Sequence, residues 1–110
     1  MKKKLLLFVI SWMVMASGAA NAAVYFVLVP DMSQLSWQLD SNGVVWLRNL
    51  NAFDSSVLGC CYNFSIDTTT ATGKSMWSAI LTKIELAQPL YLGLGNGNAS
   101  PGPVTYIGNW

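Results

Sequence analysis

Residues 59–87, GCCYNFSIDTTTATGKSMWSAILTKIELA, decide the fold class because the hydrophobic period changes once along them. Residues 59–67 alternate with a period of two, which predicts a strand. The side chains expected to face the core are those of Cys60, Tyr62, Phe64 and Ile66. A helical stripe follows, formed by Met76, Trp77, Ile80, Leu81, Ile84 and Ala87. Asp67 or one of the threonines at 68–70 is expected to cap this helix, and Pro89 to end it near Gln88.

Turn residues and apolar runs place the other strands around this unit. Residues 35–50 predict a hairpin whose turn is Ser41-Asn42-Gly43, because asparagine and glycine tolerate positive φ. Three further strands are predicted at residues 24–29, 90–94 and 104–107. One helix over a mostly antiparallel sheet of about five strands indicates a mainly β (α+β) class or a small closed barrel.

The N-terminal segment has the pattern of a secretory signal peptide. Three lysines precede a short apolar run, and small residues lead to an A-x-A cleavage site ending at Ala22. The run is shorter than the stretch of about 20 residues that spans a bilayer. We therefore expect residues 1–22 to be removed, which leaves no transmembrane segment. Residues 23–110 should form a single domain, secreted or periplasmic in a Gram-negative bacterium.

The composition excludes several function classes. Loss of three lysines changes the net charge from +1 to −2, and only Arg48, Lys74 and Lys83 remain basic, too few for nucleic-acid binding. The chain has no histidine, which excludes Ser-His-Asp and Cys-His catalysis and the usual zinc ligand sets. Residues 73–75 resemble the end of a phosphate-binding loop, but Thr68 stands where that motif needs glycine. We expect no enzymatic activity, no cofactor and no metal.

The two cysteines of the chain, Cys60 and Cys61, are neighbours in the sequence. An oxidising compartment favours a disulfide. Neighbouring Cα atoms, however, lie about 3.8 Å apart, closer than the roughly 4.4–6.8 Å of ordinary disulfides. Three arrangements therefore remain open: Cys60 buried with Cys61 free, a disulfide between the two neighbours, or an intermolecular disulfide through Cys61.

Two regions are candidates for binding. Trp37 and Trp46 flank the hairpin turn beside amide and charged groups. They either fill the core or form a platform on which rings stack against sugars while polar groups bond to hydroxyls. The loop at residues 95–103 is rich in glycine, asparagine and proline, and surface loops of this kind often contain the residues that bind a ligand. The candidate binding residues are Trp37, Asp40, Asn42, Trp46, Arg48, Asn96 and Asn98.

The chain resembles small secreted proteins of gammaproteobacteria that are related to the B subunit of subtilase cytotoxin, an AB5 toxin. The resemblance rests on the order of three segments: the hairpin, GCCYNFSID at residues 59–67 and GKSMWSAILT at residues 73–82. The resemblance extends chiefly over residues 35–92. It implies a five-stranded OB-like antiparallel barrel with a helix after the third strand, homo-oligomers (pentamers in the toxins) and binding of cell-surface glycans. The expected function is a secreted binding module directed at a glycan. The alternative is a structural envelope protein, or an inhibitor that docks a protein partner through the loop at residues 95–103.

Overall fold

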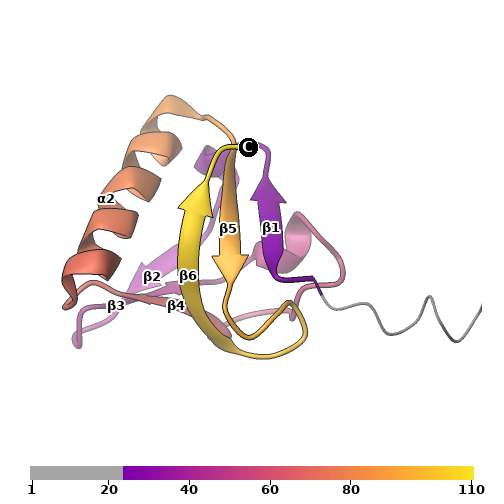
Figure 1. Cartoon of the computed structure of the whole chain (residues 1–110), viewed down its shortest axis with the longest axis horizontal. Coiled ribbons are helices and arrows are strands. Elements are labelled where there is room, and N and C mark those ends of the chain that lie inside the picture. Colours follow the sequence, from indigo (N-terminus) through magenta and orange to yellow (C-terminus); the bar gives the residue numbers. More distant parts are fainter. Residues whose placement is uncertain (1–23) are drawn as a thin grey trace, which may run out of the picture.

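The computed structural model describes residues 24–110, so the expected signal segment and its cleavage after Ala22 lie outside the described residues. Six strands form one sheet in the order β1-β5-β6-β4-β3-β2, and the helix α2 (Ala71–Leu86) packs beside it (Figure 1). The strands are β1 (Phe26–Val29), β2 (Trp37–Leu39), β3 (Val44–Leu47), β4 (Phe64–Asp67), β5 (Leu90–Leu94) and β6 (Gly102–Gly108). Two 3-10 helices, η1 (Met32–Gln34) and η2 (Leu50–Ala52), lie in the connections.

The sheet is open, not closed into the expected barrel. Closure would require β1 to pair with β2, but these strands are the two edges of the sheet. The chain between them turns through η1, which packs against α2, and the Met32 N–H donates to the Gln88 carbonyl at 3.1 Å. β4 and β6 run parallel, whereas the other neighbouring strands are antiparallel. The α+β class is confirmed. The five-stranded OB-like barrel is wrong, because the sheet has six strands and the helix follows the fourth.

The hydrophobic core joins the helix to one face of the sheet. Trp77 and Ile80 of α2 are buried, and Met76 and Ile84 pack against them, which confirms most of the predicted helical stripe. The buried strand residues are Val27, Val29, Val45, Leu47, Phe64, Ile66, Leu90, Leu92, Leu94 and Val104. Burial of these apolar side chains is the main driving force for folding.

Both ends of α2 are capped by the chain. Thr70, one of the predicted caps, accepts the Gly73 N–H on its hydroxyl oxygen at 3.0 Å. At the other end Ala87 adopts a left-handed conformation, with φ of 52°. Gly73 lies against the carbonyl oxygen of Asp67, and a Cβ atom there would overlap that oxygen. Close packing of the helix on β4 therefore explains the glycine of the Gly-Lys-Ser sequence.

The hairpin is confirmed and the strand before the helix is shorter than predicted. Trp37 pairs with Leu47 and Leu39 with Val45 across a turn in which Gly43 has φ of 78°. β4 begins at Phe64, after a series of bends at residues 60–63.

The bends before β4 overturn part of the expected core. Cys60 and Tyr62 are exposed, so the prediction that they face the core is wrong, while Phe64 and Ile66 are buried as predicted. Cys60 and Cys61 are bonded to each other. Neighbouring side chains of an extended strand point to opposite faces, so a regular strand cannot continue through this bond.

Candidate functional site

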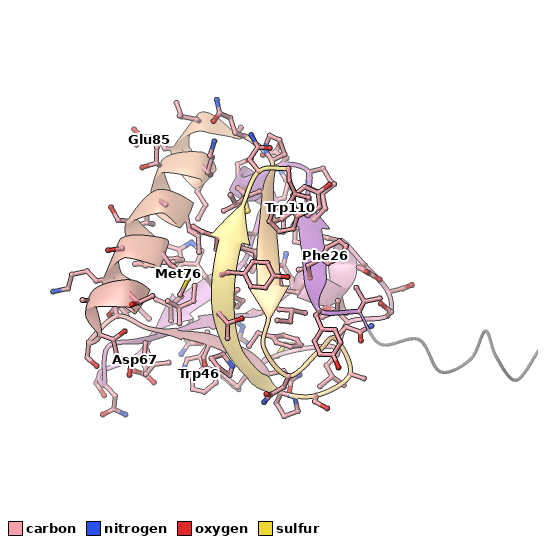
Figure 2. All side chains as sticks on the ribbon, in the orientation of Figure 1. Phe26, Trp46, Asp67, Met76, Glu85 and Trp110 are labelled. Atoms are coloured by element: carbon pink, nitrogen blue, oxygen red, sulfur yellow. A yellow bond between two sulfur atoms is a disulfide. The ribbon has the colours of Figure 1, made fainter. Side chains whose placement is uncertain are left out.

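The hairpin register places a set of polar and aromatic side chains on the solvent side of the sheet. Gln38 lies opposite Trp46, and Trp46 lies opposite Ser65 of β4. Their neighbours Val45 and Leu47 are buried on the other face. Because side chains alternate along a strand, Trp46 must point away from the core. Figure 2 shows Trp46 and the helix residue Met76 on opposite sides of β3 and β4.

Arg48, just after β3, lies at the centre of this set. Its Nη1 group donates to Gln38 Oε1 and, at 3.0 Å, to the hydroxyl oxygen of Tyr62. The guanidinium carbon is 4.9 Å from the centroid of the Tyr62 ring, within the range of a cation–π interaction. Its Nη2 group is 3.8 Å from Cys60 Sγ. We call this surface the Arg48 platform, formed by Gln38, Asp40, Trp46, Arg48, Tyr62 and the Cys60–Cys61 disulfide.

Trp46 links the platform to the hairpin turn. Its ring meets Tyr62 edge-on, with 5.9 Å between centroids. Its indole N–H donates to Asp40 Oδ2 at 3.0 Å. The other carboxylate oxygen accepts the main-chain N–H groups of Asn42 at 2.8 Å and Val44 at 3.1 Å. These bonds, the one from Trp46 first, hold the pKa of Asp40 below its usual value, so Asp40 is an ionised acceptor at neutral pH.

The sequence left three arrangements of the cysteines open. The structure has the second of them, a disulfide between the neighbours Cys60 and Cys61. Cys60 is exposed and Cys61 is half-buried. Neither cysteine is free in the described chain. Because Cys60 borders Arg48, the disulfide forms one side of the platform.

The predicted binding residues divide between two faces. Asp40, Trp46 and Arg48 are brought together, with Asn42 in the adjoining turn. Trp37 lies on the opposite face of the hairpin, where its ring meets Trp77 of α2 at 4.9 Å between centroids. Trp37 therefore packs between sheet and helix, although 42% of it is exposed.

The side chains of Asn96 and Asn98, in the loop at residues 95–103, form hydrogen bonds within the protein. Asn98 is 6% exposed; its Oδ1 accepts the Val24 N–H at 3.3 Å and its Nδ2 donates to the Ser56 hydroxyl at 2.8 Å. Asn96 Nδ2 donates to the Pro101 carbonyl at 2.9 Å, within the loop itself. Asn98 is buried and bonded through both its oxygen and its nitrogen, so it has little capacity left for a ligand, whereas Asn96 is exposed and is bonded through its nitrogen. Neither side chain is among those that form the platform.

Gln38 and Tyr62 are the platform residues that the sequence-based candidates lack. Gln38 was predictable in part, since the turn sets the hairpin register that places it opposite Trp46. The alternation of Tyr62 with Phe64 predicts a core position, and only the bends at residues 60–63 place Tyr62 outside.

Two carboxylates near the hairpin turn, Asp40 and Asp67, are not tuned as general acids. The pairing of Val44 with Asp67 brings a second acid near the Asp40 turn. The Thr69 hydroxyl and N–H lower the pKa of Asp67, and the charge of Asp40 opposes that shift only in part. A general acid at neutral pH needs a raised pKa, and both groups are shifted the other way. Within residues 24–110, no cluster of three or more acidic, cysteine or histidine side chains is arranged to hold a metal ion.

Comparisons with known proteins identify no relative of this chain. No protein-family model, curated protein or solved structure matches the chain. The resemblance to the subtilase cytotoxin B subunit therefore stays a prediction. In the part of the chain that the structure describes, no helix has the length and apolar content to cross a bilayer.

Proposed function

We propose that the protein is a secreted, non-enzymatic binding module that recognises a glycan on the Arg48 platform. The observation that carries the proposal is the position of Arg48, whose guanidinium group contacts Gln38 and Tyr62 on the solvent side of the sheet. An arginine held by an aromatic ring and an amide at an open surface combines the polar and apolar groups that a sugar requires.

The platform has a solvent-accessible aromatic surface. Tyr62 is 54% exposed, and Trp46 is half-buried beside it. Contact with Trp46 and Arg48 restricts the Tyr62 ring before a ligand arrives. A ring that is already ordered loses less conformational entropy on binding, which favours stacking against the apolar face of a sugar.

The platform also has hydrogen-bonding groups of both kinds. A guanidinium group carries five N–H donors in a planar fork, and the contacts with Gln38 and Tyr62 leave some of them for a ligand. Asp40 Oδ1 is occupied by two main-chain N–H groups, but Oδ2 accepts only the Trp46 indole N–H and can accept a further hydrogen bond from a ligand. Sugar hydroxyl groups donate and accept, so a surface with both an acidic and a basic group beside aromatic rings suits them.

The proposal is tested by measuring binding of the purified protein to a panel of immobilised oligosaccharides, followed by titration in solution with tryptophan fluorescence. Three variants are compared: Arg48→Ala, Arg48→Lys and Lys74→Ala. Lys74 is exposed in the first turn of α2, so its replacement removes the same charge away from the platform.

We expect the wild type and Lys74→Ala to bind at least one oligosaccharide equally. Arg48→Ala should weaken binding about tenfold or more, the loss expected when a hydrogen bond to a charged group is removed. Arg48→Lys should also bind less well, because lysine lacks the planar fork. Absence of binding by the wild type, or equal binding by folded Arg48→Ala, would refute the proposal.

A further inference from the structure

The solvent face of β1, β5 and β6 carries a second group of aromatic side chains. The Trp110 ring stacks on Tyr91 with 4.3 Å between centroids, and Phe26 meets both rings edge-on at 5.8 and 6.0 Å. Figure 2 shows Phe26 and Trp110 close together in front of these strands. Phe26 is 42% exposed and is fixed by its neighbours at the edge of the sheet.

This half of the molecule has no charged side chain. Residues 24–30 and 86–110 contain no acidic or basic residue, so the charged side chains of the described chain all lie between residues 31 and 85. An apolar surface without charged side chains suits a partner of the same kind, because no charged side chain has to be desolvated. An identical copy of the same surface meets this condition without like-charge repulsion.

The edge strand β1 has main-chain groups available for pairing. β1 pairs with β5 alone. The Leu94 N–H donates to the Tyr25 carbonyl at 2.7 Å, and hydrogen-bonded pairs alternate along antiparallel strands. By that alternation Val27 and Val29 also bond to β5, while Phe26 and Leu28 direct their N–H and C=O groups to the open edge. Across residues 24–110, no loop hydrogen bond reaches these groups of Phe26 or Leu28.

The neighbouring residues restrict how a second β1 could pair with this edge. A register that matches Phe26 with itself needs Val24, whose N–H and C=O are bonded to Asn98. A register that matches Leu28 with itself needs Pro30, which has no N–H. The register centred on Val27 uses only the open groups, since it places Phe26 of each copy opposite Leu28 of the other.

We propose that two copies of the chain join through antiparallel pairing of their β1 strands in this register. Each of the two Phe26–Leu28 pairs exchanges a pair of N–H···O bonds, and the four side chains pack together on the aromatic face. The interface is small, so the dimer is weak and its population depends on concentration. The Arg48 platform lies beside β2 and β3, at the edge of the sheet opposite to β1. Pairing through β1 therefore leaves the platform of each copy accessible to a ligand.

The dimer is tested by sedimentation equilibrium of the purified protein between about 1 µM and 1 mM, the concentration range of weak association. Leu28→Lys places a charge opposite the partner's apolar side chain at an exposed position (38% exposed). Leu39→Lys is the matched control, because Leu39 is an exposed leucine (52%) on the other edge strand, β2.

We expect the wild type and Leu39→Lys to form dimers with the same dissociation constant, and Leu28→Lys to raise it more than tenfold while its circular dichroism stays unchanged. Hydrogen exchange supplies an independent measurement: the amides of Phe26 and Leu28 should exchange more slowly as the protein concentration rises, and should lose that protection in Leu28→Lys. A monomer throughout the range, a dimer that Leu28→Lys leaves intact, or amides insensitive to concentration would overturn the proposal.

Discussion

The indole N–H of Trp46 donates to the carboxylate of Asp40 at 3.0 Å and joins β3 to the turn that precedes it. The same carboxylate accepts the N–H groups of Asn42 and Val44, so one ionised group orders both the turn and the tryptophan of the Arg48 platform. Hydrogen bonds to an ionised acceptor are stronger than bonds between neutral groups, which gives the turn a dependence on pH.

Stability should fall at acidic pH. Hydrogen bonds hold the pKa values of Asp40, Asp54 and Asp67 below the usual value of an aspartate in the folded protein. The unfolded chain therefore takes up protons at a higher pH than the folded one, so the stabilisation is complete above about pH 5 and is lost as the pH falls through the folded-state pKa values. Urea unfolding at pH 7, 5 and 3 should give similar free energies at the first two values and a lower one at pH 3.

Asp40→Asn should reduce stability at pH 7, because an amide oxygen is a weaker acceptor than a carboxylate for the bonds from Trp46, Val44 and Asn42. The difference between this variant and the wild type should shrink at pH 3, where the wild-type carboxylate is also being protonated. An equal difference at both pH values would show that the charge of Asp40 plays no part.

Thr70→Ala should remove the N-cap of α2 and destabilise the protein by about 1 kcal/mol. Thr72→Ala is the control, since Thr72 lies exposed in the first turn of the same helix and supplies no cap. Chemical denaturation of the two variants and the wild type measures the difference. Equal losses for both threonines would contradict the capping role.

Ala87→Gly should stabilise the protein. Ala87 has a left-handed conformation with φ of 52°, which costs a residue with a Cβ roughly 1 kcal/mol and costs glycine almost nothing. The added freedom of glycine in the unfolded chain offsets part of the gain. A rise of a few degrees in the melting temperature is expected, and a fall would show that the backbone at this position is not strained.

Asn98→Ala should destabilise the protein by about 1–3 kcal/mol, the cost of leaving buried polar groups without partners. The variant loses the bonds to Val24 and Ser56, which connect the loop at residues 95–103 to two other segments. Asn96→Ala, which removes a bond within the same loop, should cost less. Thermal unfolding of the two variants separates these effects.

Local patterns were sufficient to predict most of the secondary structure. β5 was predicted with its observed bounds, and the hairpin was predicted from alternation and a Ser-Asn-Gly turn. The helix was predicted from its stripe, and its cap, Thr70, is one of the four candidates at residues 67–70. These features depend on residues close together in the chain, and their signals lie within one stretch of sequence.

The candidate site was predicted only in part. The positions of Asp40, Trp46 and Arg48 around one turn predict that they lie together, and they do. The same reasoning includes Trp37, but Trp37 faces the helix because strand alternation places it on the other side of the hairpin. Tyr62 was missed because a period of two cannot reveal that a strand has been interrupted.

Local spacing and side-chain chemistry are enough to predict the α+β class, the hairpin, the helix and the residues around the Asp40 turn. Only the folded chain shows that the sheet stays open between β1 and β2, that β4 pairs in parallel with β6, and that Tyr62 lies beside Arg48. These outcomes depend on contacts between segments that are far apart in the chain, such as η1 with α2, β4 with β6, and Tyr62 with Arg48. Packing between segments far apart in the chain leaves no periodic signal in either of them.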